Sequence, residues 1–159
     1  MGDGDAMSST RVRRLGPGDE PVLALLGRED ADFDLEGRGG PLNVPSPAAS
    51  RAFLADPNVL FWIAERGATI VGLLYCNQVR TRDHERPELL LYEIGVRSAF
   101  RRQQVGRILL DAMHDWMRAQ AVETCWVLGD NPGAVAFYQA CGFGLEVPAP
   151  TYLVWERGA

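Results

Sequence analysis

The sequence contains no lysine: all sixteen of its basic residues are arginine, and with 21 acidic residues the net charge is −5. General nucleic-acid binding needs basic surface to neutralise phosphates, so this acidity argues against it. No apolar run approaches the roughly 20 residues that a membrane-spanning helix needs. The polar, acidic N-terminal stretch does not have the pattern of a secretory signal peptide. We therefore expect a cytoplasmic protein without a membrane partner.

Cysteine is also scarce. Cys76, Cys125 and Cys141 are odd in number and form no CxxC or CxxH spacing, so the sequence predicts neither a disulfide framework nor a metal site. We interpret the three thiols as small hydrophobic side chains without a catalytic role. The phosphate-binding signatures GK[ST] and GxGxxG are absent, which disfavours a nucleotide-binding module.

The 159 residues suit one domain, which we expect over residues 11–159, preceded by a disordered extension at residues 1–10. Pattern and turn signals predict strands at 11–15, 60–65, 69–79, 88–96, 124–128, 143–147 and 152–155. Helices are expected from about Asp19, at 46–55, at 105–120 and at 131–141, and residues 30–45 are expected to form a loop. Antiparallel strands followed by a β-α-β-α-β order predict an α/β fold: one mixed, mainly antiparallel sheet with helices on both faces.

The strand at Leu89–Val96 is apolar at both alternating positions, which is typical of a central strand buried on both faces. Glu93 is the exception. Because burying an isolated charge costs on the order of several kcal/mol, we expect Glu93 either to pair with an arginine or to face a cavity.

A short loop leads from this strand into the best helix of the chain, Val105–Gln120, whose apolar residues recur at helical spacing. Such a junction aims unpaired backbone N–H groups and the positive end of the helix dipole at one point, which favours an anion such as pyrophosphate. Gly106 permits close approach, and Arg101, Arg102 and Arg107 add positive charge. The alternative is an ordinary loop with a solvated arginine cluster.

Another helix is predicted by local signals alone. Asn131 suits the N-cap, Pro132 the first helical position, and Gly142 a left-handed C-cap. Tyr138 within this helix is either an aromatic at the edge of the core or a functional phenol.

Two of these segments resemble the GNAT superfamily of N-acetyltransferases. Val96–Leu110 resembles its motif A, (Gln/Arg)-x-x-Gly-x-(Gly/Ala): Arg101 matches the first position and Gly106 the last, whereas Gln104 replaces the usual glycine. Asn131–Phe143 resembles motif B. A side chain at position 104 predicts a wider loop, or weaker cofactor binding if a positive φ is required there.

The resemblance implies a sheet splayed at its middle, with acetyl-CoA as cosubstrate in the splay and no metal. An amine attacks the thioester directly, with Glu93 as base, a backbone N–H near Val96 as donor to the thioester oxygen, and Tyr138 as acid for the departing thiolate. The cofactor-binding residues implied are Ile94, Gly95, Val96, Arg101, Arg102, Gln103, Gln104, Val105, Gly106, Arg107, Asn131, Ala134, Phe137 and Tyr138.

Within the superfamily the chain most resembles aminoglycoside 3-N-acetyltransferases of the gentamicin/fortimicin type, through Leu26–Glu29, Leu91–Val96 and Phe100–Gln103. This implies an aminoglycoside resistance enzyme with a polyamine substrate, and superfamily members are often homodimers. Carboxylates would attract such a cation, and the expected substrate-binding residues are Asp30, Asp32, Asp34, Glu93 and Asp130.

Three alternatives stay open. In the first, the acidic stretch is only a solvated loop, since exposed ion pairs are worth under about 1 kcal/mol each. In the second, the substrate is a peptide N-terminus, a lysine side chain or a small polyamine. In the third, the protein is an acetyl-CoA-binding sensor without turnover, an interpretation that the replacement at Gln104 motivates.

Overall fold

A computed structural model describes residues 9–33 and 43–158 of the chain. The expected extension at residues 1–10 therefore lies mostly outside the described residues, as does Asp34. By its internal contacts the chain divides into two compact units, residues 1–128 and 129–159.

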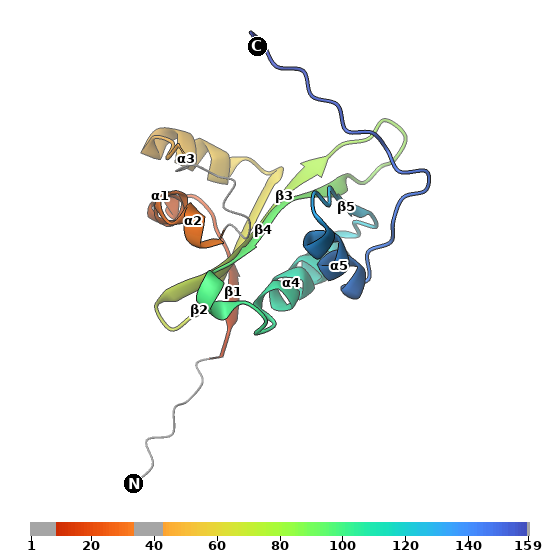
Figure 1. Cartoon of the computed structure of the whole chain (residues 1–159). Helices are drawn as coiled ribbons and strands as arrows, with labels where there is room; N and C mark the ends of the chain where they lie inside the picture. The colour runs from red at the N-terminus through yellow and green to blue at the C-terminus, as the bar shows by residue number, and fades with distance from the viewer. Residues whose placement is uncertain (1–8, 34–42, 159) are drawn as a thin grey trace. The chain divides into compact units, whose positions relative to one another are not determined.

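The first unit is built on a five-stranded sheet with the order β1-β2-β3-β4-β5 (Figure 1). The strands are β1 (Arg11–Arg14), β2 (Val59–Arg66), β3 (Thr69–Val79), β4 (Glu88–Val96) and β5 (Cys125–Val127). Neighbours are antiparallel except β4 and β5, which are parallel. The expected mixed, mainly antiparallel sheet is confirmed.

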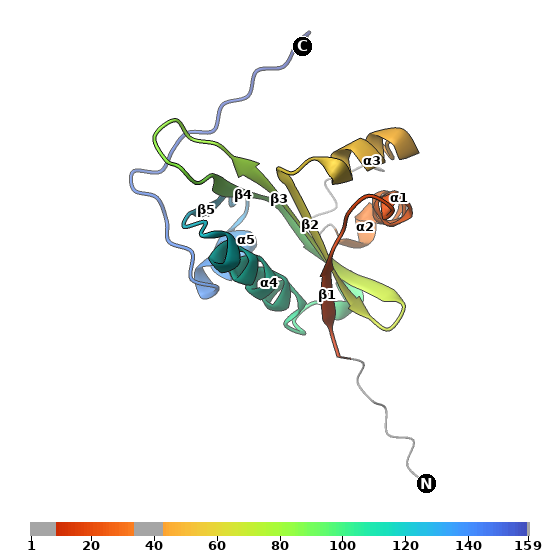
Figure 2. The ribbon, with the colours of Figure 1, turned by 180° about the vertical axis from the view of Figure 1, so that it is seen from behind.

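Helices cover both faces of this sheet, as Figures 1 and 2 show from opposite sides. On one face lie α1 (Glu20–Arg28), α2 (Asp30–Phe33) and α3 (Pro47–Ala55), which contribute Leu26, Phe33 and Leu54 to one buried cluster with β2 and β3. On the other face lies α4 (Val105–Gln120), whose Met113 contacts Cys76 of β3. A short 3-10 helix, η1 (Ser98–Phe100), follows β4.

Local signals in the sequence placed several boundaries well. Ser46 caps α3 by accepting a hydrogen bond from Ala49 N, and α4 has the predicted bounds. Asp19 stands at the N-cap of α1 but does not cap it with its side chain; instead its carboxylate accepts hydrogen bonds from Gly16 N and from Arg13. The short helix α2 was not predicted, because residues 30–45 were expected to form a loop.

The second unit contains α5 (Pro132–Ala140), capped at Asn131 as predicted. The strands expected at 143–147 and 152–155 are wrong: residues 143–158 contain no strand, and Tyr152, Leu153 and Trp155 are exposed. These residues favour extended backbone, but a strand also needs a partner edge for its hydrogen bonds, which local preference does not supply.

None of the helices within residues 9–33 and 43–158 is long and apolar enough to cross a bilayer.

Candidate active site

Strand β4 carries a β-bulge immediately before Glu93. Tyr75 of β3 pairs with Glu93, but the next residue, Cys76, pairs with Leu91, so Tyr92 is an extra residue in the ladder. Leu91 lies on the α4 side, because Cys76 beside it contacts α4. One extra residue reverses the alternation of side chains between the faces. Glu93 therefore faces the α1–α3 side instead of the core beneath α4.

The carboxylate of Glu93 is half-buried on this side. Burial raises the pKa of Glu93, and the negative charge of Asp30 in α2 raises it further. Within the described residues, no arginine pairs with Glu93. Of the two alternatives from the sequence, the arginine partner is therefore not found. A half-buried carboxylate with a raised pKa is a stronger base than an ordinary exposed glutamate.

Aromatic rings line the same side beside Glu93. Tyr92, the extra residue of the bulge, is 67% exposed and its ring lies 5.3 Å from that of Tyr75. Tyr75 stacks on Phe61 and meets Phe53 edge-on. One end of the row is thus packed in the buried cluster, and the Tyr92 end is open to solvent. An exposed ring next to a carboxylate can hold a cation or the apolar face of a sugar ring.

The edge of β4 beyond the bulge has no strand partner on the β5 side among the described residues, because β5 pairs only with Leu89–Leu91. Arg97 N donates to Val71 O of β3. Since successive N–H groups of a strand point in opposite directions, Val96 N–H points to the open edge. Val96 O on that edge accepts a hydrogen bond from Arg101 Nε at 3.1 Å. The expected site residues Ile94, Gly95 and Val96 therefore lie beside an edge that an extended ligand could pair with.

The loop between β4 and α4 ends in left-handed backbone. Gln104, at the N-cap of α4, has φ 68° and Arg102 has φ 59°. The position that the sequence comparison singled out therefore requires a positive φ, which costs a residue other than glycine about 1–2 kcal/mol. Gln104 makes no capping hydrogen bond through its side chain. The first-turn N–H groups of α4 have no intrahelical acceptor and are placed as anion donors.

The side chains of this loop divide into two kinds. Val105 and Gly106 are buried, so they can offer a ligand only their backbone, whereas Arg102 and Arg107 are exposed. Gln103 stabilises the loop itself, donating to Ala99 O and accepting from Arg66. Arg101 leaves its Nη2 buried without a hydrogen-bond partner in the described structure. An orphaned cationic donor beside the open strand edge fits an anionic or carbonyl-bearing ligand.

The two acidic residues of α2 do not face the same partner. Asp30 acts on Glu93, whereas Asp32 pairs with Arg97 at 2.9 Å and accepts a hydrogen bond from Ser98 Oγ. The bond from Ser98, followed by that from Arg97, lowers the pKa of Asp32. Arg97 was missed by sequence reasoning. Its signal was an arginine directly after a buried strand in a chain with a nearby acidic run.

The expected site residues of the second unit share one helix and its cap. Asn131 Oδ1 accepts a hydrogen bond from Ala134 N at 2.8 Å, and Asn131 Nδ2 donates to Asp130. Tyr138 is buried, with its ring 5.5 Å from Phe137. Gly142 adopts the predicted left-handed conformation, with φ 96°. The role of Tyr138 stays a prediction.

Neither Cys76 nor Cys125 has the properties of a reactive thiol. All three cysteines are free, and Cys76 is buried against Met113. Burial raises the pKa of Cys76, and it raises the pKa of Cys125 to about 12, so neither forms a reactive thiolate readily. Within the described ranges, no group of three or more His, Cys, Asp or Glu side chains could hold a metal ion.

Comparison with curated proteins gives partial matches to N-acetyltransferases. The chain is 30% identical over 96 residues to N-acetyltransferase 8 of Rattus norvegicus, covering 59% of this chain and 43% of that protein. It is 32% identical over 73 residues to the [ribosomal protein bS18]-alanine N-acetyltransferase of Salmonella typhimurium, covering 45% of this chain and 49% of that one. The chain thus matches about half or less of the length of these relatives.

Solved structures match over nearly the whole chain. An aminoglycoside acetyltransferase, meta-AAC0020, from an uncultured soil metagenomic sample was crystallised with sisomicin and has a TM-score of 0.78 at 20% identity, covering 92% of this chain and 97% of that one. A second, HMB0005, also from such a sample, has a TM-score of 0.76 at 25% identity, covering 92% and 99%. The model of the acetyltransferase (GNAT) family matches residues 29–143. The chain belongs to the acetyltransferase (GNAT) family.

Proposed function

We propose that the protein is an acetyl-CoA-dependent N-acetyltransferase in which Glu93 deprotonates the acceptor amine. The observation that carries the proposal is the bulge at Tyr92. It turns a carboxylate with a raised pKa out of the α4 core. On the opposite edge of β4, β5 pairs only with Leu89–Leu91 in the described structure. An ammonium must lose its proton before it can attack a thioester, so a base at this place has a direct use.

Acetyl-CoA supplies the activated acetyl thioester, and the residues present fit it. The open edge at Ile94–Val96 offers hydrogen bonds to an extended pantetheine chain. The first-turn N–H groups of α4, with Arg102 and Arg107 nearby, suit a pyrophosphate. Arg101 has an unused donor beside the same edge. We also propose Asn131, Ala134 and Phe137 as cofactor-binding residues, as the family resemblance implies.

Three groups of the chain handle charge and protons in this scheme. Glu93 accepts the proton of the amine, directly or through a water. Val96 N–H donates to the oxygen on which negative charge develops. Tyr138 donates its phenolic proton to the departing thiolate. Both raised-pKa thiols stay outside the reaction.

An aminoglycoside is the proposed acceptor, acetylated at its 3-amino group. Two carboxylates, Glu93 and Asp30, interact electrostatically at the site and suit a polycation. The exposed ring of Tyr92 beside them suits a sugar ring. The match to the soil acetyltransferase HMB0005 supports the same substrate class.

A second candidate acceptor is a peptide N-terminus. The match to the ribosomal protein alanine N-acetyltransferase of Salmonella typhimurium favours it. A peptide would also present one ammonium to Glu93, but it needs neither several carboxylates nor a ring to stack on.

The test is an acceptor panel with the full chain and acetyl-CoA: gentamicin, an alanine-led peptide, a lysine-containing peptide and spermidine. Release of CoA is followed with a thiol reagent, and products are analysed by tandem mass spectrometry and NMR. We expect turnover of gentamicin, one acetyl group added, and that group on the 3-amine.

Two results would overturn parts of the proposal. Turnover of peptides with no acetylation of any aminoglycoside would reject the acceptor while keeping the chemistry. Tight acetyl-CoA binding by calorimetry with no CoA release for any amine would identify a non-catalytic sensor.

A further inference from the structure

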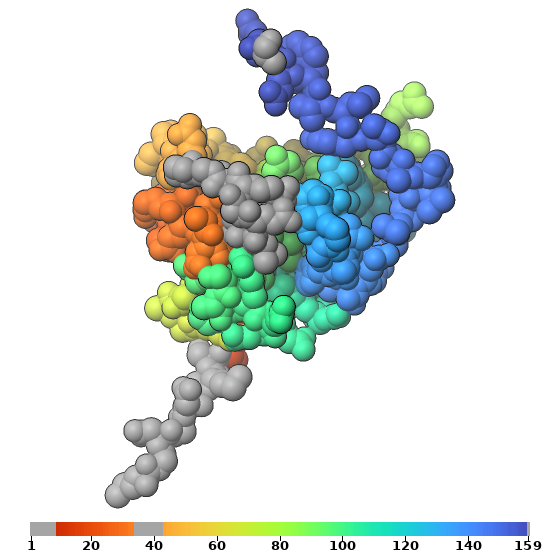
Figure 3. Space-filling view, in the orientation of Figure 1, coloured from red at the N-terminus to blue at the C-terminus, as the bar shows by residue number. Residues whose placement is uncertain are grey.

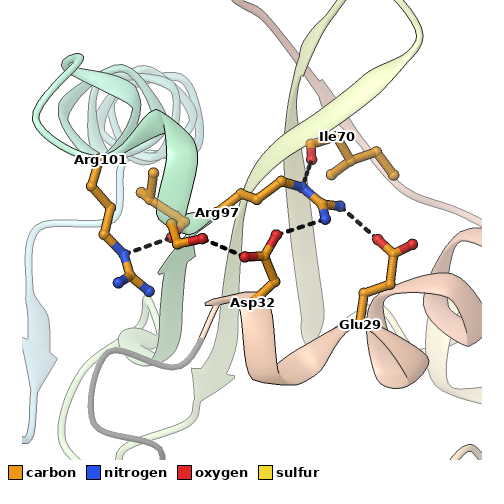
Figure 4. A network of polar contacts seen from close by, with 7 residues as sticks. Glu29, Asp32, Ile70, Arg97 and Arg101 are labelled. Atoms are coloured by element: carbon orange, nitrogen blue, oxygen red, sulfur yellow. Dashed lines mark hydrogen bonds and ion pairs between the residues drawn. The ribbon is translucent and has the colours of Figure 1, made fainter.

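Arg97 lies at the centre of a polar cluster that the proposed chemistry does not use. Its Nη2 pairs with Glu29 at 2.7 Å, its Nη1 with Asp32 at 2.9 Å, and its Nε donates to Ile70 O at 2.9 Å. Figure 4 shows the guanidinium between these three acceptors, which come from the C-cap of α1, from α2 and from β3. Only 17% of the side chain is exposed. Arg97 thus uses all three of its nitrogens in separate directions, which lysine could not do.

The cluster is held by apolar contacts as well. The guanidinium of Arg97 lies over the ring of Phe33, 4.8 Å from its centroid. Phe33 is buried and packs on the backbone at Gly95, where an added Cβ would approach to 3.2 Å. Helix α2 therefore packs directly on the last residues of β4. Without the guanidinium of Arg97, the carboxylates of Glu29 and Asp32 would repel each other where the two elements meet.

The cluster joins the two halves of the proposed site. On the acceptor side, Glu29 and Asp32 flank Asp30, the residue whose charge acts on Glu93. On the cofactor side, Arg97 directly follows Val96, and Ser98, which donates to Asp32, begins the loop into α4. In the space-filling view the orange surface of α1 and α2 lies beside the green surface of this loop (Figure 3).

We propose that Arg97 is a positioning residue that locks the α1–α2 corner to the start of the cofactor loop, so that the acceptor carboxylates and the cofactor donors are held as one unit. The inference rests on the proposed function. It predicts that loss of Arg97 damages acceptor binding and cofactor binding together, although Arg97 itself touches neither ligand.

The test compares two variants. Arg97→Met removes the charge but keeps much of the side-chain volume. Arg97→Lys keeps the charge but lacks the three separately directed donor nitrogens of the guanidinium. Arg51→Met is the matched control, because Arg51 also pairs with a carboxylate, that of Glu20 in α1, at 2.9 Å but forms no hydrogen bond or ion pair with β4 in the described structure. In Arg97→Met we expect KM to rise about tenfold for both acetyl-CoA and the amine, the loss of one charge-assisted hydrogen-bond set. Arg97→Lys restores part of this loss, and Arg51→Met leaves both constants unchanged.

A pH profile separates positioning from plain stability. Among the described residues, the titratable groups beside Glu93 are Asp30 from α2, Tyr75 from β3 and Tyr92 from its own strand. Once α2 is released, Asp30 no longer acts on Glu93, so the inflection of kcat/KM that belongs to Glu93 moves to lower pH in Arg97→Met. Asp30→Asn produces the same direction of shift with the lock intact.

Readouts without turnover keep this inference distinct from the proposed function. NMR titration of the Glu93 carboxyl, assigned with Glu93→Gln, and calorimetry of acetyl-CoA binding both work if no amine is acetylated. If Arg97→Met does not fold, Ser98→Ala removes only the tie between the loop and Asp32 and is expected to weaken acetyl-CoA binding. Folded Arg97→Met with a lowered melting temperature, but with unchanged ligand affinities and an unchanged Glu93 titration, would reduce Arg97 to a structural residue and overturn the inference.

Discussion

At the scale of single residues, the properties of Glu93 follow from its neighbours more than from its own chemistry. The sequence indicated that a carboxylate in an apolar strand needs a partner or a cavity. In the structure, a β-bulge places the Glu93 side chain on the α1–α3 side of the sheet, where burial and Asp30 raise its pKa. Such a group destabilises the folded chain when it ionises, which is common at functional sites.

Glu93→Gln tests the role as base. General-base catalysis contributes roughly 10²–10⁴-fold, so we expect kcat/KM to fall about 100-fold, with the affinity for acetyl-CoA unchanged. In the wild type, kcat/KM rises with pH as Glu93 loses its proton. We expect this pH-dependent rise to be absent in Glu93→Gln. Glu88→Gln, at the start of the same strand, serves as the control. If kcat/KM of Glu93→Gln still rises with pH as in the wild type, Glu93 is not the base.

The same variant has a predictable effect on stability. A raised pKa means that the folded state binds this proton more tightly than the unfolded chain, so ionisation lowers the free energy of unfolding as pH rises through the folded pKa. Below the ordinary glutamate value of 4.5, both states are protonated and the penalty is absent. Glu93→Gln should therefore raise the melting temperature at neutral pH, with a smaller gain at acid pH. Calorimetric scans at both conditions measure the difference.

At the scale of elements, helix α4 begins and ends in left-handed backbone carried by residues other than glycine. Gln104 has φ 68° at its N-cap and Ala121 has φ 54° at its C-cap. Both ends carry the same kind of conformational cost, but only the first lies in the proposed cofactor loop. The pair therefore separates the cost of backbone strain from an effect on the ligand.

Gln104→Gly and Ala121→Gly form a matched test. Each is expected to stabilise the protein by about 0.5–1 kcal/mol, because relief of about 1–2 kcal/mol of left-handed strain exceeds the roughly 0.4–1 kcal/mol that glycine adds to unfolded-state entropy. Only Gln104→Gly should also lower KM for acetyl-CoA, since it clears a side chain from the loop. Chemical denaturation and initial rates check both. Equal effects of the two variants on KM would show that position 104 has no special contact with the cofactor.

At the scale of the whole first unit, the close packing of α4 on the sheet is expected to fix the position of the proposed cofactor loop. A Cβ added at Gly72 of β3 would lie 2.7 Å from Val105 Cγ1 and 3.0 Å from Leu109 Cδ1. Val105 is the first residue of α4. The absence of a side chain at Gly72 therefore lets the N-terminal end of α4 pack directly on the sheet.

Gly72→Ala should displace this end of α4. Overpacking of a well-filled core costs typically about 1–3 kcal/mol, and we expect a destabilisation in that range together with weaker acetyl-CoA binding. Gly16→Ala is the control, because no atom lies within 4 Å of an added Cβ there. Urea unfolding and calorimetry measure the two effects. Unchanged acetyl-CoA affinity in a destabilised Gly72→Ala protein would show that the loop is positioned without this contact.

Prediction from the sequence succeeded where short-range physics decides. The helical period of Val105–Gln120, the helix expected at 46–55 and the left-handed Gly142 all depend on a few neighbouring residues. The strands expected at 143–147 and 152–155 failed, because local preference for extended backbone was the only signal and no partner edge entered the reasoning.

The sequence by itself determined the mixed α/β class, the strand-loop-helix junction at Arg101–Gly106 and the unusual carboxylate at Glu93, because composition, periodicity and residue type are local properties. Only the tertiary structure decided which face Glu93 occupies, since one extra residue in a ladder reverses every side chain after it. It also decided that Arg97 joins Glu29 and Asp32 across more than sixty residues of chain. Such pairing depends on how separate elements pack, and no local pattern in the sequence encodes it.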